Sequence, residues 1–389
     1  MRVVMVSDVY FPRINGVSTA IQTYQQALRA YGVEVSLVAP DYGLPCSESW
    51  ISRVSARAVP RDPEDRLVRW GKMHDAVEAA VEQGADLIHV QTPFVAHYAG
   101  RYAARRYGVP LIATYHTLFE EYLKHYAPLV PASLLRGLAR RFSRQQCNSL
   151  DAVIVPSQAI YKRLLSYGVT TPIFVLPTGI SLQTSPDGSR QAFRARFGID
   201  EQRPIALFVG RVAHEKNIDF LLDVVALARE SVPDILLLIA GEGPALPFLR
   251  KIVVDRGLQG CVQFIGYLDR RTELPACYAA ADVFAFASRT ETQGLVLLEA
   301  MATGLPVVAL AEMGTVDILG AHRGALVPDD NPADFSLLLT RVLRDAGLRH
   351  RLSIEGRAYA AEWSDEALAG EMAQLYRQII SSYTTRQAA

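Results

Sequence analysis

The sequence is poor in cysteine and has no excess of charge of either sign. Its 389 residues include only 4 cysteines, which lie far apart and form no CxxC pair. Neither a zinc ribbon nor a disulfide scaffold is therefore expected, and a reducing cytoplasm fits. The 40 basic residues balance the 40 acidic ones, which argues against nucleic-acid binding through bulk electrostatics.

Long hydrophobic runs are absent as well. The apolar run at 235–240 is far shorter than the ~20 residues that a membrane span needs. Residues 1–7 carry one basic residue and a short apolar run, which is typical of a strand rather than of a signal peptide. Nothing in the sequence predicts a membrane span, and peripheral attachment stays open.

Short apolar runs alternate with longer amphipathic segments along the chain. Runs typical of strands occur at 3–7, 35–39, 87–90, 111–114, 152–155 and 173–176, and the pattern restarts at 205–209, 235–240, 262–265, 283–287 and 307–309. Apolar strands with helical crossovers indicate a parallel sheet that is covered on both faces.

The composition and the repeated pattern predict two domains. Half of the residues are hydrophobic (50%), and a domain takes ~100–200 residues. The polar segment 180–190 carries Pro and Gly, as linkers do. We therefore expect two doubly wound α/β domains, 1–182 and 183–364, followed by a helical segment in 365–389. Because ligands bind beyond the carboxyl ends of such strands, two facing domains would form a central cleft.

The loop after the first strand contains Asn15-Gly16. Gly16 would let a ligand approach the backbone closely, and the helix that follows favours anions at its N-terminus. Ser18 is predicted to cap that helix. The alternative is a turn that needs only a positive φ angle. The GxGxxG fingerprint is missing, which disfavours a dinucleotide-dependent dehydrogenase.

Two cations follow the first strand of the second half. Arg211 and Lys216 lie in the loop after Gly210, and Asn217 is predicted to cap the next helix. Two fixed cations beside a helix N-terminus form a site for a diphosphate and could stabilise charge on a phosphate leaving group. The alternative is a pair of solvated cations, with Lys216 paired to Glu215.

Two glutamates lie at the carboxyl end of the strand at 283–287 and beyond it. Glu291 is in the polar loop, and Glu299 is in the helix that Gly294 begins and Gly304 ends. Carboxylates there suit hydroxyl-rich ligands, because each accepts two hydroxyl hydrogen bonds. A carboxylate in an otherwise apolar helix needs a partner or a ligand, and the less favoured alternative is that Glu299 bonds a neighbouring arginine.

His116 follows the strand at 111–114, again at the end where ligands bind. A histidine there could hydrogen-bond a substrate hydroxyl or a developing charge, although a lone histidine is more often structural. His89, inside an apolar run, is predicted to pack structurally.

A basic amphipathic stretch without acidic residues spans 134–144. It contains Arg136, Arg140, Arg141 and Arg144. Contact with an anionic membrane surface and a solvated helix face are both consistent with this pattern.

Taken together, these motifs resemble one family. Asn15-Gly16, His116-Thr117, Gly210-Arg211 with Lys216, and the Glu291/Glu299 pair with seven residues between them occur in the order that is typical of the retaining GT-B glycosyltransferases of family 4. The resemblance covers essentially the whole chain. It implies an α/β fold of two Rossmann-like domains that face a central cleft, with a nucleotide sugar held by the second domain and the helix of 365–389 returning to the first.

The resemblance also implies roles for the candidate residues. Arg211 and Lys216, after Gly210, would hold the diphosphate, and Gly16 would approach it from the first domain. Glu291 would bind donor sugar hydroxyls, Glu299 would hold the ribose, and His116 would contact the transferred sugar. The backbone at Gln293, Gly294 and Leu295 would face the sugar and the phosphate. No cofactor and no divalent metal are implied, and the sequence has no Asp-x-Asp motif.

One departure bears on the acceptor. Many members of the family have an aromatic residue where Gln293 stands. The residues around Gln293 and His116 are similar to members that glycosylate diacylglycerol-type lipids and to lipid mannosyltransferases. The resemblance thus implies transfer of a hexose, from UDP-glucose or GDP-mannose among other donors, to a membrane lipid on the cytoplasmic leaflet. A soluble or polysaccharide acceptor is the alternative, and a non-catalytic sugar-nucleotide binding protein is the alternative of another class.

Overall fold

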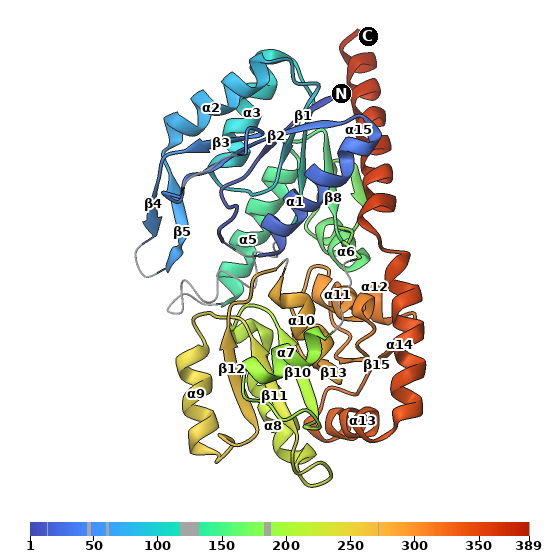
Figure 1. Ribbon diagram of the computed structural model, residues 1–389. Coiled ribbons are helices and arrows are strands. Elements are labelled where there is room, and N and C mark those ends of the chain that lie inside the picture. Colours follow the sequence, from blue (N-terminus) through green and yellow to red (C-terminus); the bar gives the residue numbers. More distant parts are fainter. Residues whose placement is uncertain are drawn as a thin grey trace. The chain divides into compact units, whose positions relative to one another are not determined.

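The chain forms two compact units in the computed structural model (Figure 1). Unit 1 comprises Met1–Gly179 and Asp365–Ala389, and unit 2 comprises Ile180–Ser364. The structure describes all residues except 14, 45–47, 60–61, 117–131, 183–187, 271 and 389, and only the backbone of 62–65, 132–133 and 388. Thr117 and residues 183–187 of the expected linker therefore lie outside the described residues.

Unit 1 is built on a parallel sheet of seven strands in the order β3-β2-β1-β6-β7-β8-β9. Its strands are β1 (Arg2–Val6), β2 (Glu34–Pro40), β3 (Ile51–Val54), β6 (Leu87–Val90), β7 (Leu111–Thr114), β8 (Ala152–Val155) and β9 (Ile173–Val175). All six apolar runs that are expected to be strands between residues 3 and 176 are strands in the structure. The edge strand β3 escaped prediction because its four residues, only one of them fully buried, carry no continuous apolar run.

Helices cover both faces of this sheet (Figure 1). They are α1 (Gly16–Ala27), η1 (Leu28–Tyr31), α2 (Trp70–Glu82), α3 (Val95–Tyr107), α5 (Ala132–Cys147), α6 (Gln158–Ser166) and α15 (Asp365–Ala388). Alternate residues of β1 point to opposite faces. Val3 and Met5 pack in one core with α1 and α15, whereas Val4 and Val6 pack in a second core with α2 and α3.

A short antiparallel hairpin, β4 (Ala56–Val59) and β5 (Asp62–Val68), also belongs to unit 1. It was not expected from the sequence, because its charged residues interrupt the apolar alternation.

Unit 2 repeats the architecture with six parallel strands in the order β12-β11-β10-β13-β14-β15. They are β10 (Ile205–Val209), β11 (Leu236–Ala240), β12 (Val262–Gly266), β13 (Val283–Phe286), β14 (Val307–Ala309) and β15 (Ala325–Leu326). The central strands β10, β11 and β13 are buried throughout, as expected of strands covered on both faces.

The helices of unit 2 surround this sheet, and all of them except η2 contribute to one core. They are α7 (Ser189–Arg196), η2 (His214–Lys216), α8 (Ile218–Ala228), α9 (Leu246–Asp255), α10 (Glu273–Ala280), α11 (Leu295–Thr303), α12 (Thr315–Leu319), α13 (Pro332–Arg344) and α14 (Ala346–Ala361). The chain enters and leaves unit 2 at one place, because Ile180 N–H donates to the carbonyl of Trp363 at 2.9 Å.

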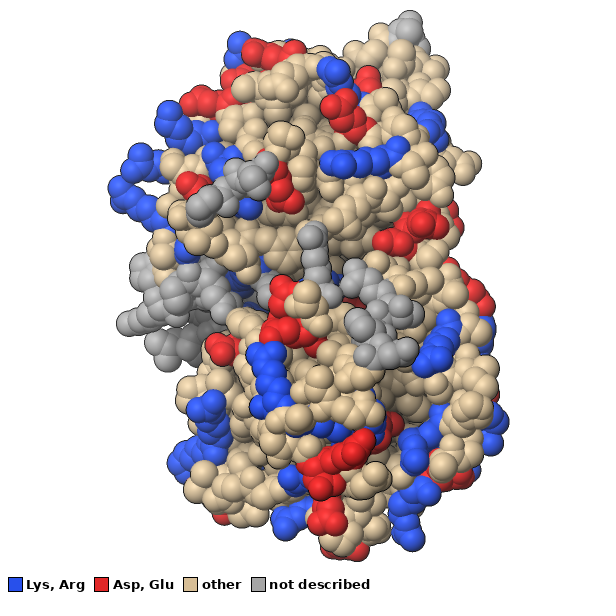
Figure 2. Space-filling model, in the orientation of Figure 1, with Lys and Arg blue, Asp and Glu red and all other residues tan. Residues whose placement is uncertain are grey.

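Figure 2 shows basic and acidic side chains on the same face, separated by wide uncharged areas. Among the described residues, no helix combines the length and the apolar character that crossing a membrane requires.

Candidate active site

The carboxyl ends of β10 and β11 are joined backbone to backbone. Gly210, the residue after β10, has a φ angle of +153°, and its N–H donates to Ala240 O at 3.1 Å. A Cβ atom placed on Gly241 would lie 1.9 Å from the carbonyl oxygen of Gly210. Only glycine fits at 241, so this contact fixes the loop that carries Arg211 and Lys216.

Lys216 and Glu291 form an ion pair, although they come from loops after different strands. Lys216 ends η2, which follows β10, and Glu291 lies in the loop after β13. Their side chains are 21% and 16% exposed, so that the pair is largely withdrawn from water. The alternative pairing of Lys216 with Glu215 is not the one that forms.

Asn217 ties the same two loops together. Its side-chain amide donates to Ala287 O at 3.1 Å, at the end of β13. Its backbone is left-handed, with a φ angle of +56°, and its side chain makes no capping hydrogen bond to α8. Asn217 stands at the N-cap position of α8, as expected, but its side chain does not bond the helix, because the amide is used across the sheet edge instead.

The loop before α11 is held tightly at its backbone. Gly294 has a φ angle of +96° and begins α11, as expected. The N–H of Gly314 donates to Glu291 O at 2.9 Å. Gln293 is only 6% exposed, and Leu295 is the first residue of the helix. The peptide groups of 293–295 are therefore fixed at the N-terminus of a helix, which favours anions.

Glu299 has two protein partners. Its carboxylate pairs with Arg270 and accepts a hydrogen bond from the hydroxyl of Tyr278 at 3.0 Å. Glu299 raises the pKa of Arg270, and burial together with Glu299 raises the pKa of Tyr278 well above its usual value. The less favoured alternative, that Glu299 bonds an arginine, is thus what the structure shows. One donor on each carboxylate oxygen fixes its orientation, and each oxygen still has a lone pair for a ligand.

Arg211 lies directly after Gly210 and is half-buried. Unit 2 thus gathers Gly210, Arg211, Lys216 and Glu291 at the carboxyl ends of β10 and β13. Glu299 lies about one turn into α11, beyond Gln293–Leu295. His116 and Gly16 belong to unit 1.

His116 lies just past β7 and is held by Gln91. Its Nε2 donates to the amide oxygen of Gln91 at 2.9 Å. Burial lowers the pKa of His116 to about 4, so the ring is neutral at pH 7, with Nδ1 as a hydrogen-bond acceptor. His89 is fully buried between Tyr376 and Thr114, at 2.7 Å from each. The prediction that His89 packs structurally is confirmed.

Asn15, not Ser18, caps α1. The side chain of Asn15 accepts from Ser18 N–H at 2.8 Å, so the prediction of a Ser18 cap is wrong. Gly16 has no positive φ angle, and a Cβ atom placed on it would meet nothing within 4 Å. Neither the backbone nor the packing of unit 1 requires glycine at 16, which removes the alternative of a turn that needs a positive φ angle.

Asp8 is a residue that the sequence reasoning missed. It follows β1, accepts from Thr92 Oγ1 at 2.7 Å and from Ala96 N–H at 3.1 Å, and thereby caps α3. Burial raises the pKa of Asp8 to about 6, although these hydrogen bonds lower it. The position of this carboxylate, directly after the first apolar run, is the feature of the sequence that could have indicated it.

Known proteins match most of the chain. Residues 14–184 match the model of "Glycosyltransferase Family 4" and residues 189–359 that of "Glycosyl transferases group 1". The α-monoglucosyldiacylglycerol synthase of Streptococcus pneumoniae is 32% identical over 79% of this chain and 71% of its own. The D-inositol 3-phosphate glycosyltransferase of Jonesia denitrificans is 33% identical over 77% of this chain and 74% of its own.

A solved structure gives the fold. Sucrose-phosphate synthase from Thermosynechococcus elongatus superposes with a TM-score of 0.79 at 23% identity, covering 98% of this chain and 99% of that one. The predicted fold class, two parallel-sheet α/β domains of the GT-B type, is confirmed.

Proposed function

The chain belongs to the glycosyltransferases of group 1 and family 4, and we propose that it transfers a hexose, with retention of anomeric configuration, from a nucleoside-diphosphate sugar to a hydroxyl of a membrane lipid. The observation that carries the chemistry is the Lys216–Glu291 pair at the carboxyl ends of β10 and β13. The pair brings together a cation and a carboxylate, to which the proposal assigns the phosphate and a sugar hydroxyl of the donor.

Arg211 and Lys216 hold the diphosphate of the donor in this proposal. Breaking the bond from the sugar to the diphosphate leaves negative charge on the phosphate oxygens, and a positioned cation stabilises that charge. When the donor binds, Lys216 turns from Glu291 to the phosphate, and the freed carboxylate accepts hydroxyl hydrogen bonds from the sugar. The peptide N–H groups of Gly294 and Leu295 add donors at the start of α11.

Glu299 binds the ribose of the donor through the lone pairs that Arg270 and Tyr278 leave available. In unit 1, neutral His116 hydrogen-bonds a sugar hydroxyl through Nδ1, and Gly16 leaves room for a phosphate to approach the N-terminus of α1. The departing phosphate takes the proton of the acceptor hydroxyl, which suits transfer with retention.

The proposal includes no metal and no cofactor. Arg211 and Lys216 supply the positive charge that a divalent cation would otherwise bring to the diphosphate. Turnover should therefore be unchanged by excess EDTA. A loss that Mg²⁺ or Mn²⁺ restores would contradict this part of the proposal.

The lipid acceptor is supported by the likeness to α-monoglucosyldiacylglycerol synthase. The exposed arginines of α5, Arg136, Arg140, Arg141 and Arg144, suit an anionic membrane surface. We propose a peripheral location on the inner face of the cytoplasmic membrane. The likeness to an enzyme named for D-inositol 3-phosphate favours a second candidate, transfer to a soluble acceptor.

A donor screen followed by an acceptor screen tests the function. Thermal shifts with UDP, GDP and ADP sugars identify the donor, which is then offered radiolabelled with diacylglycerol vesicles and, separately, with D-inositol 3-phosphate. Label in the organic phase supports the lipid acceptor, and label only in the aqueous product supports the second candidate. Binding of a donor without transfer or hydrolysis would contradict both.

A further inference from the structure

Gln91 and His116 come from loops that follow neighbouring strands of unit 1. Gln91 follows β6 and His116 follows β7, and these two strands pair in the sheet. Gln91 is 3% exposed, and its amide oxygen lies 2.9 Å from Nε2 of His116. Because an amide oxygen accepts hydrogen bonds and cannot donate them, this contact requires the proton of the imidazole to be on Nε2. The lone pair of the ring is then on Nδ1.

The loop that carries Gln91 is held at three points. The N–H of Gln91 donates to a backbone carbonyl of β1 at 2.8 Å. The hydroxyl of Thr92 donates to the carboxylate of Asp8 at 2.7 Å. The side-chain amide of Gln146, from α5, donates to Pro93 O at 2.5 Å. The amide oxygen of Gln91 is therefore presented from a fixed backbone, as the support of a functional side chain requires.

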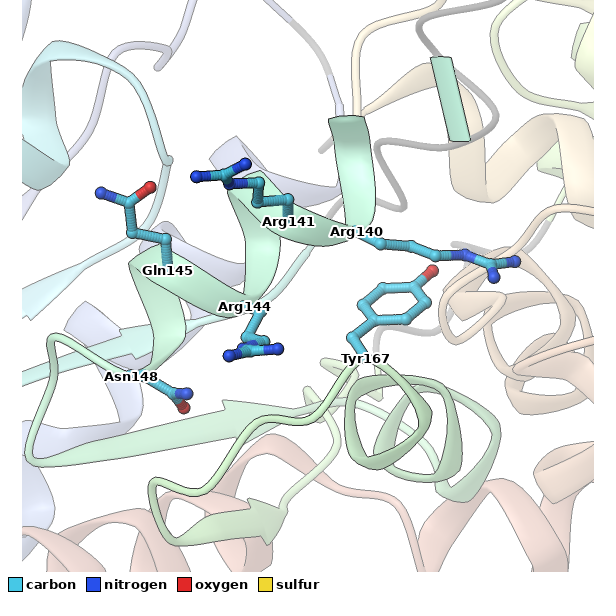
Figure 3. Close-up of a pocket in the computed structure, with 6 residues that line it drawn as sticks. All are labelled: Arg140, Arg141, Arg144, Gln145, Asn148 and Tyr167. Atoms are coloured by element: carbon cyan, nitrogen blue, oxygen red, sulfur yellow. The ribbon is translucent and has the colours of Figure 1, made fainter. Parts of the chain in front are cut away.

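The inner side of α5 holds the loop after β7 as well. The hydroxyl groups of Tyr115, in that loop, and Ser143 are hydrogen-bonded at 2.9 Å. Ser143 and Gln146 are both buried and lie about one turn apart on α5. Arg141 and Gln145 lie on the outer side of the helix, where they line a surface hollow (Figure 3). One face of α5 thus contacts both loops, which keeps the two partners in register.

A small cavity of about 40 Å³ lies beside the pair, and Gln91 and His116 both line it. His97 and Cys147 line it too. Burial lowers the pKa of His97 to about 4 and raises the pKa of Cys147 to about 12, so both side chains are uncharged at pH 7. Among the described residues, no Asp, Glu, Lys or Arg lines this cavity. Its surroundings therefore favour an uncharged imidazole at His116.

The nitrogen of the Gln91 amide gains nothing from this arrangement. Nε2 of Gln91 is buried and has no hydrogen-bond partner among the residues that the structure describes. A buried donor without a partner lowers stability, which an apolar side chain of the same length would avoid. Glutamine at position 91 is thus explained by what its oxygen does for His116 and not by stability.

We propose that Gln91 is a positioning residue that holds His116 as the neutral Nε2–H tautomer, so that Nδ1 accepts a hydrogen bond from a hydroxyl of the transferred sugar. This rests on the proposed function, in which His116 contacts that sugar. Positive charge develops on a sugar ring as its glycosidic bond breaks, and a neutral imidazole avoids the repulsion that an imidazolium would add. A ring with its proton on Nδ1 would offer no acceptor on that side.

The test compares the unaltered chain with Q91E, Q91M and a matched control, Q146M. Gln146 is a buried glutamine that lines the same cavity but bonds Pro93 instead of His116, so Q146M controls for the loss of a buried amide. Q91E keeps the shape and offers a carboxylate, which stabilises an imidazolium with protons on both nitrogens. Q91M keeps the length and removes the acceptor. Melting curves report whether each variant folds.

The first readout is the protonation of the ring. Long-range ¹H–¹⁵N correlation spectra of the chain labelled with ¹⁵N-histidine report which nitrogen carries the proton, and the signals of His116 are those missing from H116Q. We expect one neutral tautomer, Nε2–H, at pH 7 in the unaltered chain and in Q146M. In Q91E the pKa of His116 should rise, and in Q91M the single tautomer should be lost.

The second readout is the rate of transfer over a range of donor concentrations. We expect kcat to fall at least tenfold in Q91E and Q91M and to stay within threefold in Q146M. The KM for the donor should stay within threefold in all variants, because unit 2 holds the diphosphate and the ribose in the proposed function.

The proposal is overturned if the proton is on Nδ1 in the unaltered chain, or if Q91E and Q91M keep the kcat of Q146M. The spectra need no substrate. A chain that transfers no sugar would therefore count against the proposed function, and the position of the proton would still decide on Gln91.

Discussion

Replacing Lys216 by methionine removes the cation of the Lys216–Glu291 pair and keeps most of the aliphatic stem. The partner carboxylate is then left 16% exposed without its counter-charge. Breaking an exposed pair costs about 0–1 kcal/mol and breaking a buried one about 3–5 kcal/mol. For a pair that is mostly but not fully withdrawn from water, we expect the free energy of unfolding to fall by about 1–3 kcal/mol.

The same substitution should lower turnover far more than stability alone explains. A positioned group that stabilises charge on the leaving diphosphate is worth about 3–4 kcal/mol, or roughly a 10²–10³-fold fall in kcat. Released nucleoside diphosphate, measured at saturating donor, gives kcat directly. Lys251→Met is the matched control, because Lys251 pairs with Asp255 on an exposed surface of the same unit. It should change stability by less than about 0.5 kcal/mol and leave turnover unchanged.

The double variant K216M/E291Q separates the two effects. In the double variant neither charge remains, so no buried carboxylate lacks a counter-charge. Most of the free energy of unfolding that K216M loses should therefore return, as measured by urea unfolding. Turnover should stay low, because the diphosphate still lacks its cation. Turnover of K216M within fivefold of the unaltered enzyme would refute the reasoning. So would recovery of turnover in the double variant.

Three further predictions concern other parts of the site. Because burial raises the pKa of Asp8 to about 6, above its value in an unfolded chain, the folded state binds the extra proton. The free energy of unfolding of the unaltered chain minus that of Asp8→Asn should then fall by about 1–3 kcal/mol as the pH rises from about 4 to 6, and a flat difference in urea unfolding would contradict this. Tyr278→Phe removes a hydrogen bond to Glu299 and should raise the KM for the donor severalfold with little change in kcat; an unchanged KM would count against a ribose role for that carboxylate. Gly241→Ala places a Cβ atom 1.9 Å from a carbonyl oxygen and should destabilise unit 2 by more than about 3 kcal/mol, whereas Gly260→Ala, where nothing lies within 4 Å, should be nearly neutral in urea unfolding.

The sequence predicted what local patterns determine. The continuous apolar runs of β10, β11 and β13 are typical of strands buried on both faces, and all three are. The pattern therefore also predicts the residues at which these strands end. Because Lys216 follows β10 and Glu291 follows β13, both residues are predicted at the carboxyl edge of the sheet. Gly304 at the end of α11, with a left-handed backbone, follows equally from local chemistry.

Partners that come from distant segments could not be predicted. Arg270 is 29 positions from Glu299 and reaches it from the loop before α10, so nothing local to α11 indicates the pair. Asn217 stands where a cap is expected, but its amide bonds Ala287 across the sheet edge. Asp8 reaches α3 only because β1 and β6 are neighbours in the sheet. Each of these depends on strand order, which local patterns do not contain.

The split of unit 1 into 1–179 and 365–389 has a consequence for how the chain matures during synthesis. The face of the sheet that carries Val3 and Met5 is covered in part by Leu368, Met372 and Tyr376 of α15. At ~5–20 residues per second, roughly 10–40 s pass between the synthesis of residue 179 and that of residue 389. Unit 2, which is one continuous stretch, can therefore complete its core first. Until α15 emerges from the ribosome, the nascent first unit offers this apolar face to chaperones.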